Sequence, residues 1–337
     1  MSPLEERYRR LLRLLPEPAR SRWADDMVGT YLAATTRDDP EYAEFGSPTP
    51  ADRLDVLRLA LRLHLGAPGA TIRAVAAGRT VRLVALTGSV ALATQGLVGL
   101  AMAAWVHGLV PGVPAPQLPG PLLLRPEAAL GHVVDVLLVA LAVCLVRGAS
   151  TARPLAVAAL LGLVLATSLR LGGPTTLPAV LSLVTWAVPL LAAVLVPAEP
   201  APRRARWQVV VPALVTLLGP VVATAGWAAS RPEREPGAWL LALGQPVGWW
   251  VVALVAAGAA VLSRPSATAV GRLGVAALGV ALLPSLAGQL TYGGVAGYRA
   301  VVVTGLVLLA GTVLVTGASG VRHVRALPAG ATGDRSR

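Results

Sequence analysis

The chain has 337 residues, of which 55% are hydrophobic and 14% charged, and its mean hydropathy is +0.67. These values lie outside the range of soluble globular domains and favour a chain whose main solvent is a lipid bilayer. The net charge of +12 comes from arginine, because the sequence contains no lysine. The arginines flank apolar segments, so we expect them to face anionic headgroups and not nucleic acid. The lack of lysine excludes Schiff-base catalysis.

Residues 1–66 are predicted to form a small cytoplasmic domain of three amphipathic helices. Ser2 and Glu5 have the spacing of a capping box at the start of the first helix. A second helix is expected over about 20–35, and a third begins at Pro50. No apolar core follows the charged first turns, so no cleavable signal peptide is expected and the N-terminus is placed in the cytoplasm.

Each of these helices has one apolar face to bury. On the third helix we expect this face to contain Leu54, Leu57, Leu61 and Leu65. On the first two helices, the apolar residues are predicted to contact a cytoplasmic partner. They are Tyr8, Leu12, Trp23, Met27 and Tyr31.

A basic linker is predicted over 67–82, between the N-terminal domain and the first membrane helix. Gly66, with the glycine and proline that follow it, suggests a hinge. Arg73, Arg79 and Arg82 are expected to lie at anionic lipid headgroups, although ordinary positive-inside topology also predicts arginines here.

A polytopic helical bundle of about eight transmembrane helices is predicted over 83–320. Each of its apolar runs has roughly the 17–25 residues needed to cross a bilayer. The third run is the shortest. The eight runs lie near 83–106, 127–146, 154–170, 176–196, 207–229, 238–262, 268–290 and 298–317. The fold class is therefore all-α, and 321–337 is expected to be a disordered cytoplasmic tail.

The distribution of arginine supports this count, because short cytoplasmic loops hold an excess of basic residues. With the N-terminus inside, the inner side of the eight-span topology holds nine arginines and the outer side five, and each inner loop has at least as many as the outer loops beside it. The inner positions are Arg147, Arg153, Arg203, Arg204, Arg206, Arg264, Arg272, Arg322 and Arg325, and the outer ones are Arg125, Arg170, Arg231, Arg234 and Arg299. Both termini are thus predicted to be cytoplasmic, in a multi-pass protein of the cell membrane.

The N-terminal segment also resembles a known family. The sequence RYRRLLRLLPEPARSRWADD at 7–26, followed by MVGTYLAAT and then ADRLDVLRLALRLHLG, is similar to the HAAS-type signalling domain of actinobacteria. The resemblance covers about the first fifth of the chain. It implies a three-helix cytoplasmic module fused to membrane helices and associated with PadR-family transcriptional regulators. Trp23 and Asp25–Asp26 stand where such domains usually have Tyr and a Glu–Glu pair.

One carboxylate, Asp135, lies well inside a predicted membrane helix, with His132 one turn earlier. Ionisable groups are costly in lipid and usually face a partner or a cavity. We consider two alternatives. In the first, Asp135 and His132 act in a proton or cation relay. In the second, Asp135 pairs with Arg170 and holds two helices together.

Prolines interrupt several predicted spans, and Gln245 and Gln289 add polar groups at depth. Transporters use broken helices to expose backbone near the bilayer midplane, but proline is also frequent in ordinary membrane helices. The prolines in question are Pro189, Pro212, Pro220, Pro246 and Pro284.

No catalytic, metal or cofactor site is expected, because the four histidines are scattered and Cys144 is alone. The leading hypothesis is therefore a membrane-anchored signalling or regulatory protein whose N-terminal domain engages a cytoplasmic partner. The alternative is a transporter or channel subunit with a polar path through the bundle.

Overall fold

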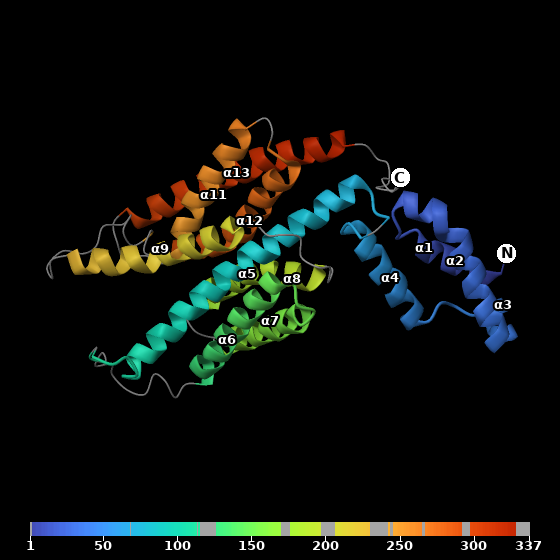
Figure 1. The fold of residues 1–337 in the computed structure, drawn as a ribbon, viewed down its shortest axis with the longest axis horizontal. Coiled ribbons are helices and arrows are strands. Elements are labelled where there is room, and N and C mark those ends of the chain that lie inside the picture. Colours follow the sequence, from blue (N-terminus) through green and yellow to red (C-terminus); the bar gives the residue numbers. More distant parts are fainter. Residues whose placement is uncertain are drawn as a thin grey trace. The chain divides into compact units, whose positions relative to one another are not determined.

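The computed structural model describes residues 2–67, 69–112, 114, 126–169, 176–196, 206–229, 242, 245–264, 267–291 and 297–327. Each regular element formed by these residues is a helix (Figure 1). The chain divides into two compact units, which are Met1–Thr80 with Arg322–Arg337, and Val81–Val321.

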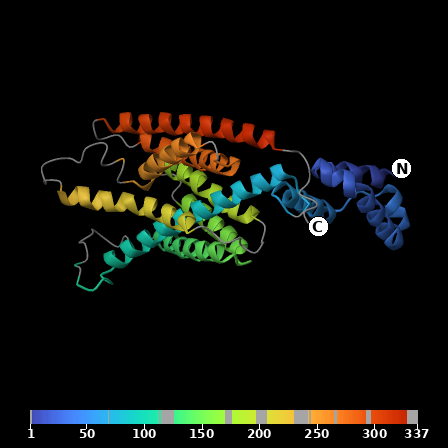
Figure 2. The ribbon, with the colours of Figure 1, turned by 45° about the horizontal axis from the view of Figure 1, so that its top comes forward.

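The N-terminal unit begins with α1 (Pro3–Leu12), α2 (Glu17–Asp38), α3 (Pro40–Phe45) and α4 (Pro50–His64), the blue helices of Figure 2. The hydroxyl of Ser2 accepts the N–H of Glu5, as the capping pattern predicts. The Glu5 carboxylate does not return to Ser2 but pairs with Arg9 at 2.9 Å. A reciprocal capping box instead begins α4, between Thr49 and Asp52.

The structure contains one helix more than the three predicted. Asp39 accepts the N–H groups of Glu41 and Tyr42, and Pro40 occupies the first helical position, so a six-residue helix forms. This helix, α3, packs against α1 and α2.

The core of the N-terminal unit is built from α1, α2, the turn between them and α4. Its buried residues are Tyr8, Leu12, Leu15, Ala19, Val28, Val56, Ala60 and Leu63. The predicted buried face of α4 is wrong: Leu54, Leu57 and Leu61 are 45%, 52% and 40% exposed. The opposite face of α4 is apolar too, and its smaller residues Val56 and Ala60 pack against the other helices.

The end of α4 lies directly against the first turns of α5 (Ile72–Val106). A Cβ at Gly78 would lie 1.9 Å from the Leu65 carbonyl oxygen, and one at Gly66 would lie 2.8 Å from the Val75 Cα. The helix thus begins inside the predicted linker 67–82. It needs no flexible hinge, because Gly66 turns the chain with a φ of 86°.

In the described residues of the second unit, the rest of α5 is followed by seven further long α-helices. Each of the eight predicted apolar runs coincides largely with one helix. The seven are α6 (Pro126–Arg147), α7 (Ala152–Ser168), α8 (Thr176–Leu195), α9 (Trp207–Ala229), α11 (Pro246–Ser263), α12 (Ala269–Gly288) and α13 (Tyr298–Ala326).

Five helical segments in the described part of the chain are long and apolar enough to cross a membrane. They are Ile72–Val106, Ala128–Arg147, Thr176–Leu195, Ala269–Thr291 and Tyr298–Ala326. Three further apolar helices are shorter, namely Ala152–Ser168, Trp207–Val222 and Val247–Ser263. The last helix, α13, continues to Ala326, so the predicted disordered tail 321–337 begins as helix.

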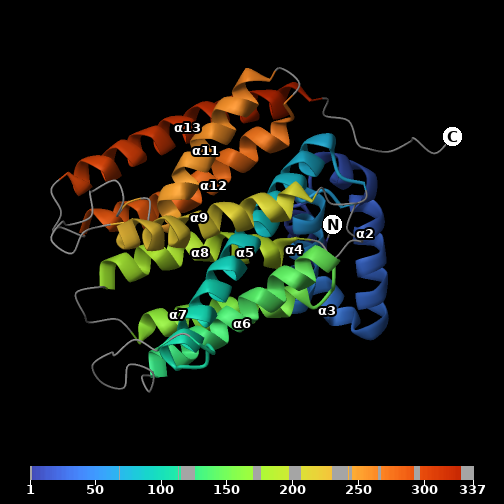
Figure 3. The same cartoon turned by 60° about the vertical axis from the view of Figure 1, so that its left-hand side comes forward.

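Two clusters of buried residues organise the second unit. The first joins α5, α6, α7 and α8, and the second joins α11, α12 and α13, which lie side by side in Figure 3. Small residues allow close approach of the backbones. A Cβ at Gly88 of α5 would lie 2.3 Å from the Pro189 Cβ, and one at Gly279 of α12 would lie 2.5 Å from a Val313 methyl carbon.

Three helices continue through the prolines in their apolar runs, as in ordinary membrane helices. Pro189 lies inside α8, Pro212 and Pro220 inside α9, and Pro284 inside α12, whereas Pro246 starts α11. Beside Pro284, the N–H of Ser285 donates to the Thr185 hydroxyl of α8 at 3.1 Å. A neighbouring helix therefore satisfies a backbone donor at the proline.

Candidate functional site

The residues predicted to bind a partner belong mainly to the core of the N-terminal unit. Tyr8 and Leu12 are buried, and Trp23, Met27 and Tyr31 pack around them. The rings of Tyr8 and Tyr31 stack with centroids 4.1 Å apart. The Tyr31 hydroxyl donates to Asp52 at 3.1 Å, so most of this apolar surface is used within the domain.

This packing also affects the tyrosine hydroxyls. Burial, followed by the hydrogen bond with Asp52, raises the pKa of Tyr31 well above its ordinary value. Burial, with a smaller effect of the Asp52 charge, also raises the pKa of Tyr8. Both phenols therefore remain neutral at physiological pH, and Asp52 links α4 to α2.

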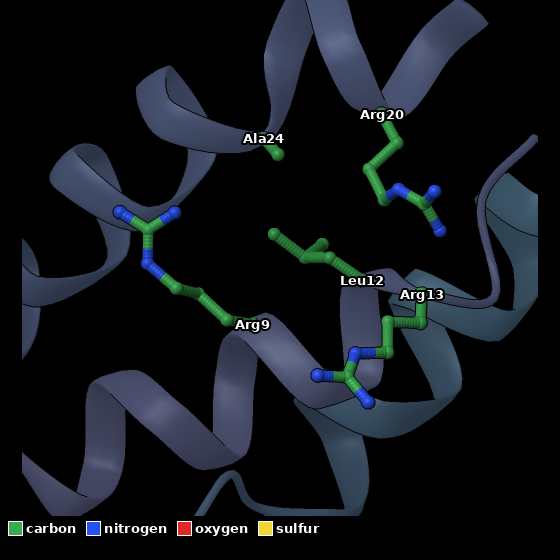
Figure 4. A pocket seen from close by; sticks show the side chains of 5 residues that line it. All are labelled: Arg9, Leu12, Arg13, Arg20 and Ala24. Atoms are coloured by element: carbon green, nitrogen blue, oxygen red, sulfur yellow. The ribbon is translucent and has the colours of Figure 1, made fainter. Parts of the chain in front are cut away.

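A surface hollow of about 440 Å³ lies between α1 and α2. Figure 4 shows the side chains of Arg9, Arg13 and Arg20 around it, with Leu12 and Ala24 between them. Leu12 is 1% exposed, so it forms an apolar floor beneath three guanidinium groups. We call this hollow the arginine groove.

Carboxylates hold two of the three arginines in place. Arg9 pairs with Glu5 at 2.9 Å and with Asp25 at 2.7 Å, and Arg20 pairs with Glu17. The hydrogen bond to Asp25 is the main reason why the pKa of Arg9 is raised. Arg13 is exposed at the rim. The groove can thus offer donors to an acidic group above an apolar floor.

The arginine groove was not predicted from the sequence, although Leu12 was identified as a candidate binding residue. The available signal was the spacing of Arg9 and Arg13, which are four residues apart and share one face of α1. Arg20 joins them only because the chain reverses after Leu15, which the sequence does not place in three dimensions.

The second candidate site is a cavity of about 450 Å³ among α5, α6, α7 and α8. His132 and Asp135 both line it, and their side chains approach to 3.8 Å between Nδ1 and Oδ2. Helix α5 passes close to α6 at this point, since a Cβ at Gly96 would lie 3.2 Å from the Asp135 Cα. The structure thus brings together the two ionisable residues of the predicted relay.

Other residues of the cavity were not predicted. Gln95, Thr167 and Trp186 add polar atoms and one aromatic ring to a wall made mostly of apolar side chains. Gln95 is a polar residue within the long apolar run of α5, and this was a signal that could have been used.

The remaining predicted polar residues lie apart from this cavity. Gln289 is buried and accepts a hydrogen bond from Tyr298 at 2.7 Å, while Gln245 is exposed at the start of α11. The residues lining the cavity include neither Gln245 nor Gln289. Arg170, the proposed ion-pair partner of Asp135, lies outside the described residues.

The arginines predicted to lie at lipid headgroups have different surroundings. Arg73 donates to the carbonyl oxygens of Arg325 at 2.8 Å and of Leu327 at 3.0 Å, at the C-terminal end of α13. A cation is favourable there because it interacts with the helix dipole and with the last carbonyl groups. Arg79 is exposed, and Arg82 is partly exposed.

Among the described residues, no group of three or more His, Cys, Asp or Glu side chains is arranged to hold a metal ion. Comparison of the chain with protein-family models, curated proteins and solved structures finds no match. The described part of the chain defines the class: a helical protein in which five helical segments are long and apolar enough to cross a membrane.

Proposed function

We propose that this chain is a multi-pass membrane protein whose cytoplasmic N-terminal domain engages a regulatory protein. The observation that carries the proposal is the arginine groove, which lies on a domain with a core of its own. The resemblance of 7–66 to HAAS-type domains supports a PadR-family regulator as the partner. An acidic segment with one apolar side chain fits the groove, because its carboxylates would meet the guanidinium groups while the apolar group lies on Leu12.

The proposed topology has eight spans and both termini in the cytoplasm. Arg73 lies at the start of α5, the first membrane helix, and contacts the last carbonyl groups of α13, the last one. The start of the first membrane helix and the end of the last are therefore on the same side of the membrane, which supports an even number of crossings. The three shorter helices are then spans as well. At 17 residues, α7 is about 26 Å long and crosses where the bilayer thins slightly.

In-cell photo-crosslinking tests the engagement of a partner. A photoreactive residue at position 13 should give one specific protein adduct, and the same residue at position 10 is the control, because Arg10 is exposed on the same helix outside the groove. Arg20→Glu should abolish the adduct without changing the amount of inserted protein. No adduct at position 13, or identical adducts at both positions, would rule out the groove.

A second candidate function is transport of a proton or small cation, and the cavity that contains His132 and Asp135 favours it. In proteoliposomes with an internal pH dye, Asp135→Asn should abolish any flux that the unmodified protein supports. Equal flux in the two proteins, or none in either, would exclude this role for Asp135.

A further inference from the structure

Helix α4 has two apolar faces, of which the domain core uses one. Val56, Ala60 and Leu63 are 2% to 4% exposed and face the core. Leu54, Leu57 and Leu61 recur at helical spacing on the other face and are 40% to 52% exposed. We call these three residues the leucine stripe. An apolar row of this kind is unfavourable in water and indicates an interaction surface.

Basic side chains lie on both sides of the leucine stripe. At 3.6 residues per turn, Arg58 and Arg62 follow one edge of the stripe, and Arg53 and His64 follow the other. The nearest carboxylate, Asp55, faces Arg58 at 3.4 Å. Long arginine side chains beside an apolar row are suited to an interfacial helix, because their stems cover hydrocarbon while the guanidinium groups reach the phosphates.

The position of α4 in the chain selects a lipid surface over other occupants. Its last turn lies against α5, where the Leu65 carbonyl oxygen meets Gly78. The long apolar run of α5 begins a few residues later, after the exposed Arg79. If α5 crosses the bilayer, α4 is held at the level of the headgroups. Its arginines are there attracted to the negative charge of anionic lipids.

We propose that the leucine stripe of α4 rests in the headgroup region of the anionic inner leaflet, with Arg53, Arg58 and Arg62 on lipid phosphates. The N-terminal domain is then oriented by lipid composition as well as by its connection to α5. This inference rests on the proposed membrane topology but requires no partner protein.

The full chain in lipid nanodiscs allows a direct test. In a Cys144→Ser background, an environment-sensitive fluorophore is attached at Leu57→Cys or at Leu61→Cys. Phe45→Cys on α3 is the matched control, since Phe45 is 66% exposed and lies outside α4. The discs contain either phosphatidylcholine alone or phosphatidylcholine with phosphatidylglycerol.

We expect blue-shifted emission at positions 57 and 61 in the anionic discs only, and unchanged emission at position 45. High salt should reverse the shift, because it screens the headgroup charge. Each of Arg58→Gln and Arg62→Gln should weaken the lipid-bound state about fivefold. Arg10→Gln should have no effect.

Water-like emission at positions 57 and 61 in both kinds of disc would overturn the inference. Equal blue-shifted emission at these positions in both kinds of disc would also overturn it, because the shift would then be independent of the headgroup charge. Failure of the chain to insert into discs would contradict the proposed topology instead, so the two failures are distinguishable.

Discussion

The two units differ in the side chains that they expose, although both bury leucines, such as Leu63 in the first and Leu141 in the second. In the N-terminal unit, large residues such as Leu4 and Leu12 are inside and arginines are outside. In the second unit, Leu161 and Leu314 are 64% and 71% exposed, whereas Ser89 and Thr316 are fully buried. The first arrangement suits water. The second suits hydrocarbon, where apolar surface gives no driving force between helices and small residues provide close packing.

Replacement of a buried leucine should have the largest effect. Leu63→Ala in α4 removes a side chain that is 2% exposed, so we expect a loss of about 2–5 kcal/mol from the stability of the N-terminal unit. Hydrogen exchange of the amides in α1 to α4 measures this loss. Leu161→Ala on α7 is the control and should cost no more than about 0.5 kcal/mol. Equal losses would contradict the difference between the units.

Replacement of a glycine by a larger residue tests whether small residues provide the close packing of the second unit. Gly88→Leu places a side chain where the Pro189 ring lies, and we expect a loss of about 1–3 kcal/mol or misassembly of α5 and α8. Thermal unfolding in detergent measures the change. Gly311→Leu is the control, because no heavy atom lies within 4 Å of the added Cβ. A stable Gly88→Leu protein would show that α5 does not pack on α8 in this way.

A smaller effect is expected at the start of α4. Thr49→Ala removes one half of the capping box, which leaves the N–H of Asp52 without its acceptor. The expected loss is about 1 kcal/mol, detected as faster hydrogen exchange in the first turn of α4. Thr30→Ala, at an exposed position inside α2, should not accelerate exchange there.

The smallest effect at neutral pH concerns Tyr31. Its pKa is raised in the folded unit, chiefly by burial, so folding favours the neutral phenol. This contribution is complete below about pH 10, the ordinary value for tyrosine, and is lost as the pH rises through the folded-state pKa. We expect the N-terminal unit to lose stability above about pH 10 and Tyr31→Phe to reduce this dependence. An unchanged alkaline profile would argue against the buried contact with Asp52.

Helix positions were largely predictable, because proline, capping residues and apolar length are local signals. Eight apolar runs predicted the positions of eight helices, and Ser2 and Pro50 mark the starts of α1 and α4 as expected. The six residues of α3 are too few to give a periodic signal. The number of spans does not follow from helix positions alone, because α7 with 17 residues lies at the lower limit of length for a membrane helix.

Three-dimensional neighbours were less predictable. Both faces of α4 are apolar, so the sequence could not tell that Val56 is buried while Leu57 is exposed. The pair of His132 and Asp135 was recognisable because the two residues are one turn apart. The groove around Leu12 depends on the reversal between α1 and α2, and the contact of Arg73 with Leu327 joins positions more than 250 residues apart, so neither follows from local pattern.

The central claim is that the chain crosses the membrane an even number of times with its N-terminal domain in the cytoplasm. Reporters active on only one side of the membrane, fused in turn to the N-terminus and directly after Leu327, test it most directly. The account predicts cytoplasmic activity at both positions. Reporters active on opposite sides of the membrane would contradict it.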